Sequence, residues 1–210
     1  MTEADLVLVP DPGMRLLASL GWLHRMPPQT VFIQEGEAAD TAYVILTGRV
    51  KVFASDADGG EIVLNICGPG ECIGDMALDG GPRSASVMTL DRVTCAVVAR
   101  DALRKAVADN PDFALRLITT LIRRNRIATS KIKGLALQGV RDRVHALLEG
   151  LAVEREGQRI VGERLSQTEI AHRVGASRDM VSRVFKELQQ DGAIRMDRRQ
   201  ITLLGRGSAR

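Results

Sequence analysis

The 210-residue sequence predicts an α+β protein with a strand-rich N-terminal part and a helical C-terminal part. Three observations indicate this. Short β-type runs occupy much of the first half, helical periodicity then continues for roughly 25 residues after Asn110, and two short helices follow Ser166 and Ser177. From these patterns we expect three regions, which are residues 1–110, 111–138 and 139–210.

Composition and charge limit the possible classes of protein. Hydrophobic residues make up 45% of the chain, and no stretch reaches the roughly 18 apolar residues that a membrane-spanning helix needs. The acidic N-terminus lacks the basic start of a secretory signal, so we expect a cytoplasmic protein without membrane contact. Residues 1–119 carry 10 Lys and Arg against 16 Asp and Glu, whereas residues 120–210 carry 19 against 10. The basic second part suggests a polyanionic partner.

Cysteine and histidine usage gives little support to redox, metal or catalytic chemistry. Cys67, Cys72 and Cys95 are an odd number without a CxxC pair, which favours buried free thiols over a disulfide framework or an iron–sulfur cluster. The three histidines are scattered among different expected elements. No nucleophile motif or P-loop ending accompanies them, and we therefore expect neither a metal centre nor an enzyme.

The N-terminal region is predicted to be an antiparallel β structure. No helix-length segment separates its β-type runs, which disfavours a parallel βαβ sheet and favours a sandwich or barrel. Glycines and aspartates mark the turns between them. The five runs are TVFIQEGEAAD, TAYVILTGRVKVFASDADGG, EIVLNICGPGECIG, SASVMTL and VTCAVVA.

One arginine stands among glycines, small residues and apolar residues in GDMALDGGPRSASV, residues 74–87. A buried guanidinium needs a carboxylate or phosphate partner, and Gly80, Gly81 and Pro82 would form a tight approach to Arg83. The segment by itself is equally consistent with a surface turn that carries one solvated arginine.

A long helix is expected after the β-rich region, because Asn110 suits an N-cap and Pro111 suits the first helical position. Gly134 and Gly139 weaken its end and predict a hinge. A seam at spacings of 3 and 4 predicts packing against another helix, often a dimer partner, with packing on its own β domain as the alternative. The seam residues are Leu117, Leu121, Arg124, Ala128, Ile132 and Leu135.

The stretch LSQTEIAHRVGASRDMVSRVFKELQQDGAI predicts two short helices joined by a turn at Gly175. Ser166 and Glu169 form a capping box for the first helix, and Ser177 caps the second. Two helices joined in this way, with arginines early in the second, are typical of a helix-turn-helix that reads DNA. The second helix also has one apolar face, made of Val181, Val184, Phe185 and Leu188.

The opposite face of the second helix carries groups that can read base pairs. Arg178 and Arg183 can each donate two hydrogen bonds to guanine, and Asp179 can accept one from cytosine. Two short strands around a basic turn follow and predict a wing that contacts phosphates. An ordinary solvated helix face is the alternative. The expected DNA-contacting residues are Ser166, Thr168, Ser177, Arg178, Asp179, Ser182, Arg183 and Arg198.

The stretch GASRDMVSRVFKELQQDGAI resembles the recognition helix of the catabolite-activator (CRP/FNR) family of bacterial transcription regulators, and the resemblance extends over nearly the whole chain. In that family a Ser-Arg-Glu triplet and a later arginine read the operator. Ser177, Arg178 and Arg183 match, and Asp179 replaces the glutamate. The resemblance implies a cyclic-nucleotide-binding β-roll of jelly-roll type, a long dimerisation helix and a C-terminal winged helix-turn-helix.

The segment IGDMALDGGPRSASV is similar to the phosphate-binding cassette of the cyclic-nucleotide branch of this family. The resemblance implies that Arg83 pairs with the cyclic phosphate and that Asp75, in the place of a glutamate, binds the ribose 2′-hydroxyl. Ser84 would donate its hydroxyl, and Gly74 would admit the ligand closely. The other residues expected at the ligand are Met76 on this segment and Thr129 and Ser130 on the long helix, near the position that reaches adenine in relatives.

The resemblance implies a homodimeric transcription regulator that responds to a cyclic nucleotide, in the first place cAMP, and binds a palindromic operator. Its expected partners are double-stranded DNA, the nucleotide, a second copy of the chain and RNA polymerase, with no cofactor besides the allosteric ligand. Cyclic GMP, cyclic di-GMP or regulation without a ligand are alternatives. A nucleotide-sensing module that does not bind DNA is a further one.

Overall fold

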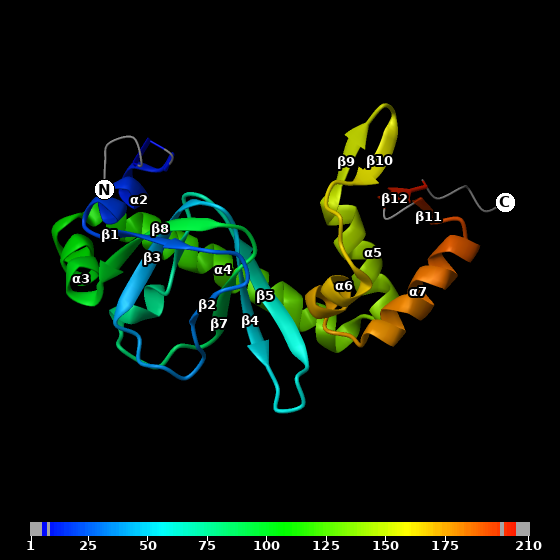
Figure 1. Ribbon diagram of the computed structural model, residues 1–210, viewed down its shortest axis with the longest axis horizontal. Helices are drawn as coiled ribbons and strands as arrows, with labels where there is room; N and C mark the ends of the chain where they lie inside the picture. Colours follow the sequence, from blue (N-terminus) through cyan, green and yellow to red (C-terminus); the bar gives the residue numbers. More distant parts are fainter. Residues whose placement is uncertain (1–5, 8, 198–199, 205–210) are drawn as a thin grey trace. The chain divides into compact units, whose positions relative to one another are not determined.

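The computed structural model describes residues 6–7, 9–197 and 200–204 (Figure 1). The chain forms two compact units, residues 1–127 and 128–210. The boundary between the units lies inside one long helix, α4 (Pro111–Leu137). Within the described part, no helix combines the length and apolar character required to cross a membrane.

The first unit contains two four-stranded sheets, and every pair of neighbouring strands is antiparallel. This arrangement confirms the expected antiparallel β structure. The first sheet has the order β1 (Trp22–Met26), β8 (Val93–Ala99), β3 (Thr41–Thr47) and β6 (Cys72–Ile73). The second has the order β2 (Val31–Ile33), β7 (Ser86–Thr89), β4 (Val50–Ser55) and β5 (Glu61–Cys67). Strand β1, which pairs with β8, was not predicted from the sequence.

Two hydrophobic clusters lie on the two faces of the first sheet. Successive side chains of a strand point to opposite faces, so Ile45 of β3 packs with Val50 and Val87 of the second sheet, whereas its neighbour Val44 faces the other way. Val44 belongs to the cluster that includes residues of three helices. These are α2 (Pro12–Ser19), α3 (Arg100–Asp109) and the start of α4, which contribute Leu17, Leu103 and Phe113.

The long helix begins where the sequence predicts. The side chain of Asn110 accepts a hydrogen bond from the backbone N–H of Phe113 at 3.1 Å, and Pro111 is the first helical residue. Gly134 lies inside the helix and does not interrupt it. The break is confined to residues 138 and 139, because α5 (Val140–Leu151) begins directly after them.

The second unit contains a three-helix arrangement and a small antiparallel sheet. Helices α5, α6 (Gln167–Val174) and α7 (Arg178–Gln190) share one cluster, in which Val144, Ile170 and Phe185 are buried. This part confirms the helix-turn-helix and the two strands of the wing; a preceding hairpin, β9 and β10, was not predicted. The sheet has the order β11 (Ile194–Asp197), β12 (Gln200–Leu203), β10 (Gln158–Val161) and β9 (Ala152–Arg155).

Candidate nucleotide pocket and DNA-reading helix

Arg83 lies just before β7, and its side chain is buried, with 7% exposed. It is therefore not the solvated arginine of a surface turn. Its Nη2 donates to the backbone oxygen of Thr41 at 2.7 Å and to the Thr41 hydroxyl at 3.1 Å, and its Nη1 donates to the Gly74 carbonyl at 3.3 Å. All three acceptors are neutral, so no carboxylate of the described residues bonds to this buried guanidinium. Such a cation favours an anionic ligand.

The backbone of Arg83 is held as firmly as its side chain. Its N–H donates to the Glu37 carbonyl at 2.8 Å, and its own carbonyl accepts from Gly36 at 2.9 Å. The turn before β3 and the loop before β7 are thereby joined. This pairing of distant segments positions the guanidinium beside Gly74.

Gly74 provides a conformation and a space that other residues cannot provide. It precedes the short 3₁₀ helix η1 (Asp75–Leu78) with φ at 72° and ψ at 21°, in the left-handed region. A Cβ at this position would lie 2.6 Å from Nη1 of Arg83 and 3.0 Å from the Thr41 carbonyl oxygen. The close approach of the loop to Arg83 therefore depends on glycine.

Asp75 forms an ion pair with Arg124 of α4, with Oδ2 and Nη1 2.7 Å apart. The two side chains are only 13% and 24% exposed. Arg124 also donates to the Cys72 carbonyl, and its buried Nε has no hydrogen-bond partner among the residues that the structure describes. Arg83 lies close by, because it bonds to the Gly74 carbonyl. Arg83, Arg124 and Asp75 together therefore contain two guanidinium cations and one carboxylate. Their net charge of one positive unit is complementary to a phosphodiester monoanion.

The position of Arg124 follows the alternative that the sequence left open for the helix seam. Its side chain packs on its own β domain, where it bonds to Asp75 and to the Cys72 carbonyl. Leu117 of the same seam is also buried, with 4% exposed. The signal that could have identified Arg124 is its charge, because it was the one cation in an otherwise apolar row.

The other expected ligand residues are more exposed. Met76 lies on η1 with 47% of its surface exposed, and Ser84 is exposed next to Arg83. Thr129 and Ser130 are exposed residues of α4 and belong to the second compact unit. The structure thus brings Gly74, Asp75 and Arg83 together within the first unit.

The side chain of Arg100 lies against the loop between η1 and Arg83. Gly80 has φ at 79°, and a Cβ there would overlap Nη2 of Arg100, from the start of α3. The backbone N–H of Arg100 donates to the Asp40 carbonyl at 2.8 Å, next to Thr41. Its Nε is buried and finds no hydrogen-bond partner within the described part of the chain. Arg100 was not predicted as part of this region, since no local sequence pattern joins it to Gly80.

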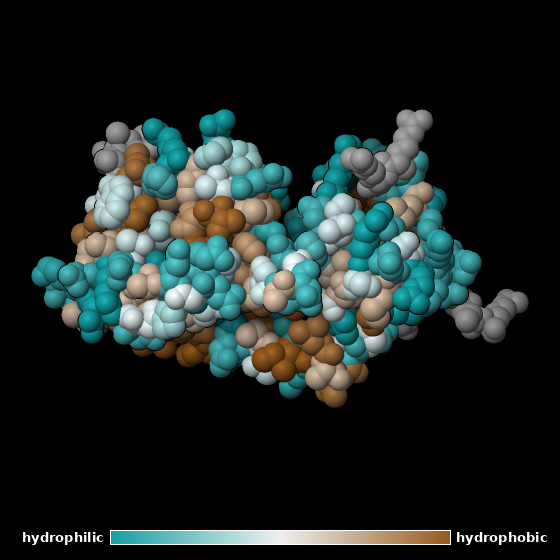
Figure 2. All heavy atoms as spheres, turned by 60° about the horizontal axis from the view of Figure 1, so that its bottom comes forward, coloured by the Kyte–Doolittle hydropathy of each residue, from teal (hydrophilic) through white to brown (hydrophobic). Residues whose placement is uncertain are grey.

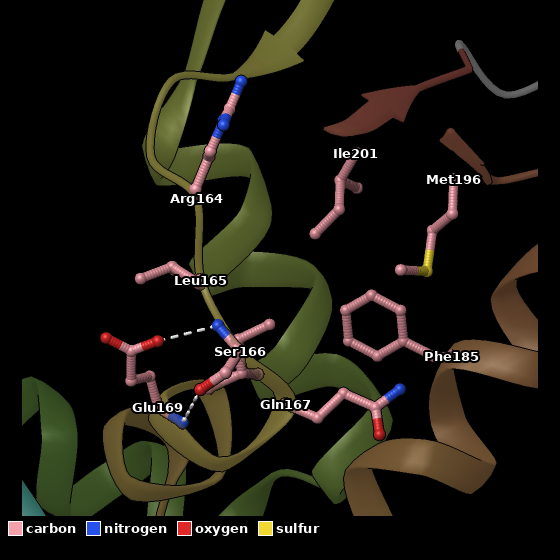
Figure 3. A pocket seen from close by; sticks show the side chains of 9 residues that line it. Arg164, Leu165, Ser166, Gln167, Glu169, Phe185, Met196 and Ile201 are labelled. Atoms are coloured by element: carbon pink, nitrogen blue, oxygen red, sulfur yellow. Dashed lines mark hydrogen bonds between the residues drawn. The ribbon is translucent and has the colours of Figure 1, made fainter. Parts of the chain in front are cut away.

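The helix-turn-helix has the predicted caps, of which Figure 3 shows the Ser166–Glu169 capping box of α6. The Glu169 N–H donates to the Ser166 hydroxyl at 3.1 Å, and the Ser166 N–H donates to Oε2 of Glu169 at 2.7 Å. Gly175 ends α6 in the left-handed conformation, with φ at 64°. The Ser177 hydroxyl then accepts from the Met180 N–H at 3.2 Å at the start of α7. These local bonds determine where both helices begin.

The predicted polar face of α7 is available for contacts. Arg178, Asp179 and Arg183 are exposed and Ser182 is half-buried, while the expected apolar residues of this helix are all buried. Thr168 is exposed on α6. The remaining expected contacts are Ser166 and Ser177, which are exposed caps, and Arg198, which lies outside the described residues.

A cavity of about 330 Å³ lies beside the start of α6 (Figure 3). Phe185 of α7 and Met196 and Ile201 of the wing point toward it, opposite the capping box. Its lining is completed by Arg164, Leu165, Ser166, Gln167, Glu169 and Ile170. The cavity lies between the wing and α6, the first helix of the helix-turn-helix.

A β-roll with a buried, uncompensated arginine, followed by a winged helix-turn-helix, defines a class of DNA-binding regulators that respond to an anionic ligand. Comparison with known families agrees with this class. Residues 23–110 match the cyclic nucleotide-binding domain, and residues 142–207 match the Crp-like helix-turn-helix domain.

Most of the chain is similar to known regulators. The CRP-like cAMP-activated global transcriptional regulator of Mycobacterium tuberculosis is 35% identical over 83% of this chain and 80% of the relative. The cAMP-activated global transcriptional regulator CRP of Salmonella typhimurium is 30% identical over 93% and 95%. The solved structure of the c-di-GMP responsive global regulator CLP of Xanthomonas campestris has a TM-score of 0.81 and 28% identity, and the match covers 93% of this chain and 100% of CLP.

The chain belongs to the CRP/FNR family of transcription regulators. It is a cyclic-nucleotide-responsive DNA-binding regulator of a non-enzymatic family. The expected family, fold class and absence of enzymatic activity are thereby confirmed.

Proposed function

We propose that this protein is a homodimer that binds cAMP at Arg83 and, in response, binds a palindromic operator. The observation that carries the ligand proposal is the buried guanidinium of Arg83, whose acceptors are all neutral. The M. tuberculosis and S. typhimurium relatives are named as cAMP-activated, which supports the choice of nucleotide.

The pocket residues suit the parts of a cyclic nucleotide. Arg83 and the exposed hydroxyl of Ser84 would donate to the cyclic phosphate, and the bare Cα of Gly74 would admit it closely. Asp75 keeps acceptor capacity beside its bond to Arg124 and would accept from the ribose 2′-hydroxyl. The other expected ligand contacts remain Met76, Thr129 and Ser130.

The apolar surface of α4 supports the homodimer. Figure 2 shows hydrophobic residues gathered on parts of the surface, and α4 contributes a long row of exposed ones. Helices that leave such residues uncovered usually bury them against another helix. The exposed large hydrophobic residues on α4 are Leu115, Ile118, Leu121, Ile122, Ile127, Ile132, Leu135 and Leu137.

The exposed face of α7 would read the operator. Arg178 and Arg183 would contact guanines and Asp179 a cytosine, with Ser166, Thr168, Ser177, Ser182 and Arg198 as the remaining contacts. A two-fold dimer would place its two recognition helices on half-sites about 10 base pairs apart. RNA polymerase is the further partner that a transcription regulator of this kind would contact.

Cyclic di-GMP is the second candidate ligand. CLP, with the high structural similarity given above, is described as c-di-GMP responsive. The same buried cation would attract either nucleotide, because both present phosphodiester groups.

Isothermal titration of the nucleotide-free protein with cAMP tests the proposal. We expect binding in the micromolar range, lost in Arg83→Leu and kept in Arg92→Leu, an exposed arginine of the same unit. Thermal unfolding verifies that each variant is folded, and Arg83→Lys tests charge without the guanidinium fork. Binding that survives in folded Arg83→Leu would contradict the phosphate role. Heat with cyclic di-GMP but not with cAMP would favour the second candidate.

A further inference from the structure

The guanidinium of Arg143, on α5, joins two helix ends within the second unit. Its Nη1 donates to the Gln138 carbonyl at 2.7 Å, directly after the last residue of α4. Its Nε donates to the Val174 carbonyl at 2.8 Å, and its Nη2 donates to the Gly175 carbonyl at 3.2 Å. Val174 ends α6 and Gly175 is its C-cap. One side chain therefore contacts both the break before α5 and the turn before the recognition helix α7.

The chemistry of these three contacts makes the junction specific for arginine. Carbonyl groups at the end of a helix lack partners within the helix, and the negative end of the helix dipole favours a cation. The planar guanidinium offers five donors in a rigid fork, so it can bond to carbonyls in different directions at once. A lysine ammonium has the charge but not this fixed geometry.

The break between α4 and α5 lacks a side-chain cap, because its last residue is a glycine. Gly139 caps α5 without a side-chain hydrogen bond, and its ψ of 159° is extended. The position of Gln138 relative to α5 is thus held by the Arg143 bond and by the backbone contacts at the start of the helix. A change of the backbone at residues 138 and 139 would move the Gln138 carbonyl away from the Arg143 guanidinium. That guanidinium also bonds to the Gly175 carbonyl.

We propose that Arg143 couples the conformation of the break at residues 138 and 139 to the turn that positions α7, and so transmits the nucleotide response to the DNA-reading helix. This inference rests on the proposed nucleotide response. Arg143 acts as a positioning residue: it contacts neither nucleotide nor DNA in the proposed scheme, and its effect is on the equilibrium between two arrangements of this junction.

The neighbouring Arg141 provides a matched control on the same helix. Its side chain pairs at 2.6 Å with Asp191, the C-cap of α7, and at 3.5 Å with Glu187 in the last turn of that helix. Arg141→Gln removes the same charge as Arg143→Gln and also breaks contacts between α5 and α7. It leaves the three carbonyl contacts of Arg143 in place.

The first measurement compares operator affinity of the full-length variants with and without saturating cAMP, or cyclic di-GMP if that is the nucleotide that binds. In Arg143→Gln we expect the nucleotide-dependent gain in operator affinity to fall by about fivefold or more, while the nucleotide Kd changes by less than about twofold. Arg143→Lys should lie between Arg143→Gln and the wild type. Arg141→Gln should keep the wild-type gain.

The second measurement, amide hydrogen exchange of the nucleotide-free protein, does not depend on a ligand. We expect Arg143→Gln to accelerate exchange together in segments 138–143 and 174–179, and Arg141→Gln to leave both segments unchanged. Acceleration in only one segment, or none, would overturn the proposed link. An unchanged nucleotide-dependent gain in Arg143→Gln would overturn its role in transmission. If the wild type responds to no nucleotide, the proposed function fails, and hydrogen exchange still decides whether Arg143 couples the two segments.

Discussion

The carboxylate of Asp75 lies 2.7 Å from Nη1 of Arg124, so the first residue of η1 is tied to the long helix α4. The pair occupies the same site as Gly74, whose carbonyl binds Arg83. A ligand that competes for Asp75 or Arg83 would therefore also act on α4. This relationship links the proposed nucleotide pocket to the proposed dimer helix.

Removing Arg124 should weaken nucleotide binding. In Arg124→Gln the carboxylate of Asp75 loses its partner and the site loses a positive charge, so we expect the nucleotide Kd to rise about tenfold. Titration calorimetry measures the effect. Arg123→Gln is the control, because Arg123 is 63% exposed and lies 3.9 Å from Glu71. Equal Kd values for both variants would show that the ion pair does not support the pocket.

Adding a methyl group at Gly74 should disrupt the site and destabilise the first unit. Gly74→Ala places a Cβ against Nη1 of Arg83 and requires a left-handed alanine, which together should cost about 1–3 kcal/mol in the free energy of unfolding. Chemical denaturation and nucleotide titration measure both effects. Gly68→Ala is the control, since a Cβ there meets no atom within 4 Å. Wild-type binding by Gly74→Ala would contradict the close approach.

Charge on the apolar row of α4 should dissociate the proposed dimer. Ile118 and Ile122 are 52% and 49% exposed, so Ile118→Glu combined with Ile122→Glu should leave the fold of each chain stable. Sedimentation analysis should then show a monomer with weakened operator binding. Trp22→Glu, an exposed apolar residue of β1, should remain dimeric. A dimer that persists with both glutamates would place the interface elsewhere.

Arg183 should contribute to sequence recognition. Loss of a bidentate contact to guanine in Arg183→Gln should weaken operator binding by about 1–3 kcal/mol and relax the preference at one base-pair position. Binding to unrelated duplex DNA should change less. Arg104→Gln, which removes an exposed arginine of α3, provides the control for net charge. A uniform loss on all sequences would indicate a phosphate contact instead.

The thiols should react slowly in the native protein. Burial is the main cause that raises the pKa of Cys67, Cys72 and Cys95 from 9.0 to about 12. At pH 8 the native thiolate fraction is small, so iodoacetamide should modify the native chain far more slowly than the unfolded chain. Unfolded thiols lose protons first, and the free energy of unfolding should fall as the pH rises from about 9 to 12. Rapid native alkylation would contradict this burial.

Local signals predicted the second unit well. The capping box joins Ser166 and Glu169, three residues apart, and the cap of α7 joins Ser177 and Met180. Such bonds form within one helical turn, so their residue types and spacing identify the helix starts. The alternation and turns of the β-rich part likewise indicated an antiparallel structure. They did not reveal β1, because its partner β8 lies about 70 residues away in the sequence and no hairpin turn joins the two.

The sequence by itself determined the fold class, the helix-turn-helix and the candidate role of Arg83, since these depend on local patterns and on a family resemblance. Only the tertiary structure decided which groups surround the charged side chains. Arg83 binds Thr41, 42 residues away, Arg124 turns to Asp75, 49 residues away, and Arg143 reaches Gly175, 32 residues away. The physical reason is that a long flexible side chain carries no periodic signal for a distant partner. Its direction follows from packing and from the location of acceptors after the chain has folded.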